Sequence, residues 1–168
     1  ITSKLWVQDM MDYESAQKGI EASLEKSGLE YFDLYLLHQA CGDYFSAWRA
    51  METAYQEGKL KAIGVSNFYA HVLVNFVNTV EIKPMVNQVE LHPYYTQEKA
   101  IETMKYYDVI PEAWAPLGGG RYNPFEDEML KMNIENLFFS TWILKTLTIC
   151  LPLSILYMFL FEIYMFVL

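Results

Sequence analysis

The sequence predicts an α/β fold over residues 1–131, in which short parallel strands alternate with helices. Four short runs rich in branched or aromatic residues start near positions 33, 61, 85 and 109, at spacings of 28, 24 and 24 residues. A helical pattern fills each interval, and such a repeat requires a parallel sheet covered by helices. Apolar types make up 53% of the 168 residues and aromatic types 16%, which supports a packed core and excludes a disordered chain.

The strands of this repeat are expected to be short. Their predicted ranges are Asp33–His38, Lys61–Val65, Met85–Val89 and Val109–Trp114. Ile1–Ser3 matches the end of a fifth strand that would precede them. The predicted sheet therefore has five strands.

The first two predicted helices carry signals at their ends. Tyr13–Ser27 has Asp12 as its N-cap and Gly28 as its stop, and its apolar residues recur at four-residue spacing. Phe45–Glu57 has an apolar face of the same kind and ends at Gly58. Both segments therefore predict helices that bury one face against the sheet.

Two shorter helices are predicted at Ala70–Val77 and Gln97–Tyr107, the latter with Thr96 as its cap. A doubly wound sheet and a (β/α)₈ barrel both fit this repeat, and the spacing alone does not choose between them. A complete barrel usually needs about 250 residues, so residues 1–131 would supply only part of one.

Charge and cysteine content restrict the class of partner and the compartment. The net charge of −9 disfavours binding to a nucleic-acid backbone. Cys41 and Cys150 are too few for a disulfide framework and fit a reducing compartment, and no Cys/His cluster has zinc spacing. The chain starts with Ile1 rather than Met, so we expect that an N-terminal segment is missing.

The composition changes near Lys131, which predicts two parts, residues 1–131 and 132–168. The second part is rich in apolar residues, and its only charged residues are Glu135, Lys145 and Glu162. As a helix, residues 146–168 would reach about 34 Å and cross a hydrocarbon core, which makes them a candidate transmembrane helix. The alternative is translation of an out-of-frame or intron-derived stretch.

Polar or aromatic residues follow the strands of the predicted repeat. They are Lys4, His38, Ser66 with Asn67, Gln88 with Glu90, and Trp114. Ligands of βα folds gather at the carboxyl ends of the strands, so these residues predict a site at one rim. Each also has a structural explanation: a buried histidine of the core, a helix cap, a bond to a neighbouring strand, or a solvated lysine.

These residues, in this order, resemble the aldo/keto reductase family. The resemblance covers residues 1 to about 131 and rests on five segments: Thr2–Trp6, Asp33–His38, Lys61–Phe68 with Met51 ten residues upstream, Asn87–Glu90, and Ala113–Gly118. It favours the barrel over the doubly wound sheet, and it implies that strands three to seven of the (β/α)₈ barrel are present, followed by an apolar helical tail.

The resemblance implies an oxidoreductase that reduces aldehydes or ketones by hydride transfer from NADPH, without a metal. It implies that Lys4 and His38 are catalytic, that Trp6 and His38 contact the carbonyl substrate, and that the cofactor is held by other residues at the same rim. Those residues are Ser66, Asn67 and Gln88 at the nicotinamide carboxamide, Trp114 on its ring, and Ala115, Pro116, Leu117 and Gly118 near the pyrophosphate, where the loop runs on to Gly120.

The sequence departs from the family pattern at both ends. In the family, the Asp and Tyr of the catalytic tetrad precede the lysine, and no residue here is assigned to either role. The segment that clamps the adenosine phosphate is not found after Lys131. We therefore expect an inactive fragment of a cytoplasmic enzyme. The alternatives are a non-catalytic binding scaffold held to a membrane by residues 146–168, and a gene fragment without a stable product.

Overall fold

The computed structural model describes residues 1–121 and 126–132. Its five strands form one parallel sheet in the order in which they occur along the chain. The strands are β1 (Thr2–Leu5), β2 (Leu34–Leu37), β3 (Ile63–Ser66), β4 (Val86–Glu90) and β5 (Ile110–Trp114). The predicted α/β class and the predicted parallel sheet of five strands are therefore confirmed.

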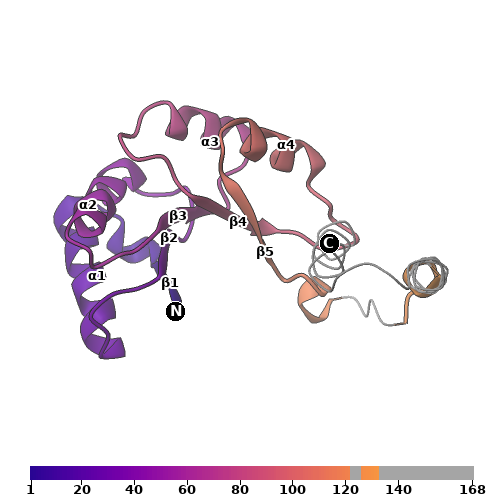
Figure 1. Cartoon of the computed structure of the whole chain (residues 1–168), viewed down its shortest axis with the longest axis horizontal. Coiled ribbons are helices and arrows are strands. Elements are labelled where there is room, and N and C mark those ends of the chain that lie inside the picture. The colour runs from indigo at the N-terminus through magenta and orange to yellow at the C-terminus, as the bar shows by residue number, and fades with distance from the viewer. Residues whose placement is uncertain (122–125, 133–168) are drawn as a thin grey trace, which may run out of the picture. The chain divides into compact units, whose positions relative to one another are not determined.

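Four α-helices connect the strands and lie along the same side of the sheet (Figure 1). They are α1 (Tyr13–Ser27), α2 (Tyr44–Gln56), α3 (Ala70–Val77) and α4 (Glu98–Tyr106), with short 3₁₀ turns η1 (Val7–Asp9) and η2 (Gly118–Gly120). The bounds of α1 and α3 agree with the prediction, and the other two differ by one residue at each end.

Local hydrogen bonds explain where the helices begin and end. Asp12 accepts a bond from the Ser15 backbone N–H at 2.7 Å, and Gly28 ends α1 in the left-handed region at φ 66°. The predicted cap of α4 at Thr96 is wrong. Its N-cap is Gln97, which adopts φ 54° and donates from Nε2 to the Glu90 carbonyl at 3.0 Å instead of capping the helix.

The core lies between the sheet and the helices. Trp48 on α2 is fully buried and donates from Nε1 to the Ile82 carbonyl at 3.0 Å. Buried Asn87 on β4 accepts from the Phe68 N–H at 3.3 Å and donates to the Phe68 carbonyl at 2.6 Å, so a polar side chain is satisfied inside the core. Packed side chains therefore fill the space between the sheet and the helices.

The chain divides into two compact units. The first contains Ile1–Glu90 and Gln97–Trp114, and therefore all strands and α-helices named above. The second contains Leu91–Thr96 and the residues from Ala115 onward. The predicted boundary near Lys131 remains a prediction.

The apolar tail stays outside this description. The predicted helix at 146–168 lies beyond the residues that the structure describes. Within residues 1–121 and 126–132, no helix has the length and apolar content to cross a bilayer.

Candidate functional site

The register of the strands brings three of the predicted site residues, Lys4, Ser66 and Gln88, to one face of the sheet. Lys4 lies opposite Leu36, and Ser66 lies opposite Gln88, which in turn lies opposite Glu112. Side chains alternate between the two faces of a strand, so residues at these positions share a face. The adjacent positions point to the helices: the Tyr35 hydroxyl lies 2.8 Å from Ser23 Oγ on α1.

The face of the sheet opposite α1–α4 is concave. Lys4 Nζ on β1 donates to Gln88 Oε1 on β4 at 2.5 Å, although two strands lie between them. In a flat sheet, strands three positions apart would be separated by about 14 Å. The curvature of the sheet therefore lets side chains from distant strands meet.

Glu112 extends this contact into a chain of three side chains. Gln88 Nε2 donates to Glu112 Oε1 at 2.6 Å. Burial lowers the pKa of the Lys4 ammonium, and the nearby negative charge of Glu112 opposes that effect. Glu112 was missed in the sequence analysis. The only signal for it is that it stands two residues before Trp114 and so shares its face.

His38 follows β2, and its ring stacks on Trp6, with ring centroids 4.5 Å apart and planes inclined by 29°. Trp6 itself is 52% exposed. Burial lowers the pKa of His38, and the positive charge of Lys4 lowers it further. Among the described residues, His38 Nδ1 is buried without a hydrogen-bond partner. The imidazole is therefore neutral at neutral pH and can act as a hydrogen-bond donor or acceptor.

Asn67 joins the ends of three strands. Its side chain accepts from Trp114 Nε1 at 2.8 Å and donates to the His38 carbonyl at 3.3 Å and to Ser66 Oγ at 3.1 Å. Its backbone is in the left-handed region at φ 61°, which Asn tolerates better than most residues. Its N–H also donates to the Gln88 carbonyl at 2.9 Å.

The structure thus places seven of the predicted site residues in the first unit, five at or just after the carboxyl ends of strands and two, Lys4 and Gln88, within β1 and β4. They are Lys4, Trp6, His38, Ser66, Asn67, Gln88 and Trp114. The remaining predicted residues, Ala115–Gly118, belong to the second unit. There the Gly118 N–H donates to the Ala115 carbonyl at 2.8 Å, and both residues have positive φ, of 79° and 52°. This segment is therefore a tight turn with exposed Pro116 and Leu117.

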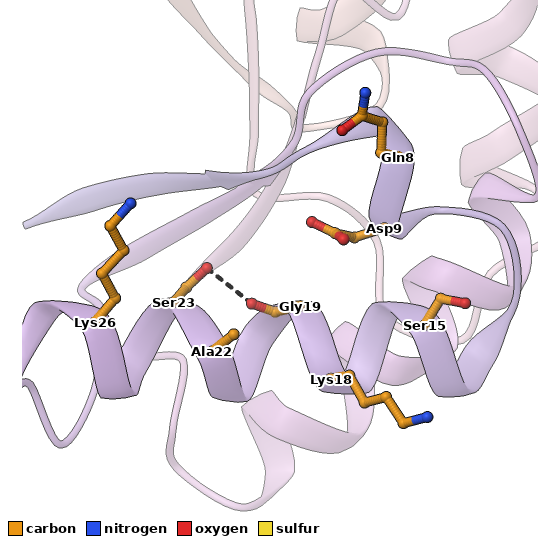
Figure 2. Close-up of a pocket in the computed structure, with 8 residues that line it drawn as sticks. All are labelled: Gln8, Asp9, Ser15, Lys18, Gly19, Ala22, Ser23 and Lys26. Carbon is orange, nitrogen blue, oxygen red and sulfur yellow. Dashed lines mark hydrogen bonds between the residues drawn. The ribbon is translucent and has the colours of Figure 1, made fainter.

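A surface groove of about 500 Å³ lies elsewhere, between η1 and α1 (Figure 2). Its lining includes Asp9 and Lys26, while Lys18 at its rim points away from it. None of the predicted site residues lines it, so it is not the candidate site. The described residues also contain no cluster of three or more His, Cys, Asp or Glu side chains that would hold a metal ion.

Known proteins are similar in sequence to this chain. Residues 1–140 match the Aldo/keto reductase family. "Uncharacterized oxidoreductase YtbE" of Bacillus subtilis is 50% identical over 122 residues, which are 72% of this chain and 43% of that protein. "Glyoxal reductase" of the same organism is 48% identical, over 72% of this chain and 44% of that protein. The chain thus spans less than half the length of these curated relatives.

Solved structures agree with these matches. The aldo-keto reductase MGS-M4, from a deep-sea metagenome library, superposes with a TM-score of 0.69 at 43% identity, over 71% of this chain and 44% of that one. An aldo-keto reductase of Bombyx mori, solved in complex with NADP, gives a TM-score of 0.65 at 33% identity, over 68% of this chain and 40% of that one.

Proposed function

The chain belongs to the aldo/keto reductase family, and from this premise we propose that it carries the nicotinamide-facing wall of an NADPH-dependent carbonyl reductase. We further propose that β1–β5 are strands three to seven of a (β/α)₈ barrel. The parallel order, the helices on one side and the concave opposite face all support this arrangement. The network around Asn67 is the observation that carries the functional proposal, because it ties Trp114, Ser66 and the His38 segment together at one rim.

The residues at this rim fit a nicotinamide group chemically. Ser66 offers a hydroxyl, and Asn67 and Gln88 offer amides, which together supply the donors and acceptors that a carboxamide needs. Trp114 is partly exposed while its Nε1 is held by Asn67, so its ring orientation is fixed for stacking. When bound, NADPH supplies the hydride that reduces the carbonyl carbon. The turn at Ala115–Gly118 is proposed to face the pyrophosphate.

His38 and Lys4 are the proposed catalytic residues of this chain. The neutral His38 imidazole donates a hydrogen bond to the carbonyl oxygen and so orients the substrate, while Trp6, stacked on it, forms a wall of the substrate site. Lys4 supplies a positive charge that lowers the pKa of a phenol placed beside it. No tyrosine among the 168 residues is assigned to that role, so we propose that this polypeptide alone does not turn over.

The proposed substrates are small aldehydes and ketones. Two relatives are named for such compounds: the glyoxal reductase of Bacillus subtilis and "Methylglyoxal reductase DkgA" of Yersinia pestis, which is 36% identical to this chain over 134 residues. Both names denote reduction of a small carbonyl compound.

The proposal is tested by titrating the 168-residue chain with NADPH and following nicotinamide fluorescence. We expect saturable binding that NADP displaces, weakened about tenfold in Gln88→Leu because one amide partner of the carboxamide is lost. Glu102→Gln, an exposed change on α4, is the control and should bind as the parent does. Equal NADPH affinity of the parent and Gln88→Leu would show that the nicotinamide carboxamide does not bind at this rim.

A further inference from the structure

The concave face carries one residue, Glu112, for which the sequence predicted no role in the site. It lies on β5 in register with Gln88 on β4, and its carboxylate accepts a hydrogen bond from Gln88 Nε2 at 2.6 Å. On the other side of the same amide, Lys4 Nζ donates to Oε1 at 2.5 Å. One neutral amide therefore stands between a carboxylate and an ammonium group, and all three side chains are partly buried.

This arrangement allows only one orientation of the Gln88 amide. A carboxylate only accepts hydrogen bonds, so the NH₂ group must face Glu112. An ammonium only donates, so the carbonyl oxygen must face Lys4. Each end of the amide then has one hydrogen-bonding position left, an N–H donor at the nitrogen and a lone pair at the oxygen. These two positions complement the acceptor and the donor of a primary carboxamide.

The charge of Glu112 also acts on Lys4. Burial favours the neutral form of Lys4, and the negative charge of Glu112 favours the ammonium form. Gln88 carries no charge and supplies only a hydrogen-bond acceptor to Lys4. Among the described residues, Glu112 is thus the charged group that opposes the effect of burial on the pKa of Lys4.

We propose that Glu112 is a positioning residue, whose carboxylate fixes the Gln88 amide for a nicotinamide carboxamide and holds the Lys4 ammonium against that amide. The carboxamide part of this inference rests on the proposed function above. The coupling between Glu112 and Lys4 rests on the hydrogen bonds that both groups make with the Gln88 amide and on the negative charge of Glu112 near Lys4. The two parts are therefore measured separately.

The test uses the full 168-residue chain and two variants of Glu112. Glu112→Gln keeps the size and an acceptor but removes the charge, whereas Glu112→Leu removes both. The first readout is the pKa of Lys4, from NMR titration of its side chain, and we expect it to fall in both variants. The second is NADPH affinity, which we expect to weaken about threefold in Glu112→Gln and about tenfold in Glu112→Leu.

Glu102→Gln changes the net charge by the same amount on exposed α4 and should move neither readout. An unchanged Lys4 pKa in Glu112→Gln overturns the proposal, and this isosteric variant does not depend on whether Glu112→Leu folds. NADPH affinity equal to that of the parent in both variants also overturns it. If the parent binds no NADPH while the Lys4 pKa still falls, the coupling stands and the proposed function fails.

Discussion

Asn67 shows how one residue organises several others. Its left-handed backbone, at φ 61°, turns the chain directly after β3, and its side chain then reaches both Trp114 and the His38 carbonyl. An aspartate could accept from the indole but could not donate to the carbonyl. Both the backbone and the amide of this residue are therefore needed for the contacts seen at the rim.

Asn67→Ala should lower the free energy of unfolding by about 2 kcal/mol, because the Trp114 Nε1–H loses its acceptor and alanine is strained at positive φ. Urea unfolding measures the loss, and the Trp114 indole N–H resonance reports on the broken bond. Asn67→Gly is the matched variant: it lacks the side chain but adopts positive φ without strain. Asn67→Gly should be more stable than Asn67→Ala. Its Trp114 indole N–H resonance should still differ from that of the parent, because the hydrogen bond is lost in both variants. Equal stability of all three proteins would contradict this account.

His38 makes the stability of the chain depend on pH. Its pKa is lowered in the folded state, so below its ordinary value the unfolded chain binds more protons than the folded one. The contribution is fully present above the ordinary histidine pKa of about 6.5 and is lost as the pH falls through the lower folded value. Between about pH 8 and pH 5, the melting temperature of the parent should fall more steeply than that of His38→Gln, which does not titrate. Parallel declines would argue against a perturbed imidazole.

At the scale of the elements, Gly64 sets the close approach of three strands. A Cβ atom at this position of β3 would lie 2.6 Å from the Val86 carbonyl oxygen on β4 and 2.7 Å from Leu36 Cδ2 on β2. The first contact is with backbone, which cannot rotate away. A glycine is therefore required here by space rather than by its φ angle.

Gly64→Ala should cost about 2–3 kcal/mol of unfolding free energy, because β3 and β4 must separate to admit the methyl group. Gly28→Ala is a useful comparison: that position has φ 66° but nothing within 4 Å of the added Cβ, so it should cost only about 1 kcal/mol of backbone strain. Denaturant unfolding of both variants separates crowding from strain. A larger loss at Gly28 would show that the strands tolerate the extra carbon.

Much of the fold was predictable because its signals are local. The periodicity of α1, its Asp12 cap and its Gly28 stop lie within one segment of sequence, and the structure confirms all three. The prediction of Thr96 as the cap of α4 was wrong: the N-cap is Gln97, whose side chain bonds the Glu90 carbonyl seven residues upstream. Glu112 was not predicted because its proposed role depends on the register of β5 against β4. Among the site residues, the positions after strands were predictable, but their bonds to one another were not.

At the scale of the whole molecule, the described part of the chain supplies one concave wall with a lysine, a histidine and a set of amide groups. The proposed chemistry needs a general acid as well, and no residue of the chain is assigned to that role. Binding of the cofactor and turnover of the substrate should therefore be separable in this polypeptide.

We expect the 168-residue chain to bind NADPH yet to reduce glyoxal or methylglyoxal at least about a hundredfold more slowly than the Bacillus subtilis glyoxal reductase. Loss of a positioned general acid commonly costs about 10²–10⁴ in rate. Loss of NADPH absorbance measures turnover, and His38→Ala measures how much of any residual rate depends on the group that orients the carbonyl. Turnover within about tenfold of the relative, abolished by His38→Ala, would mean that another residue of this chain donates the proton.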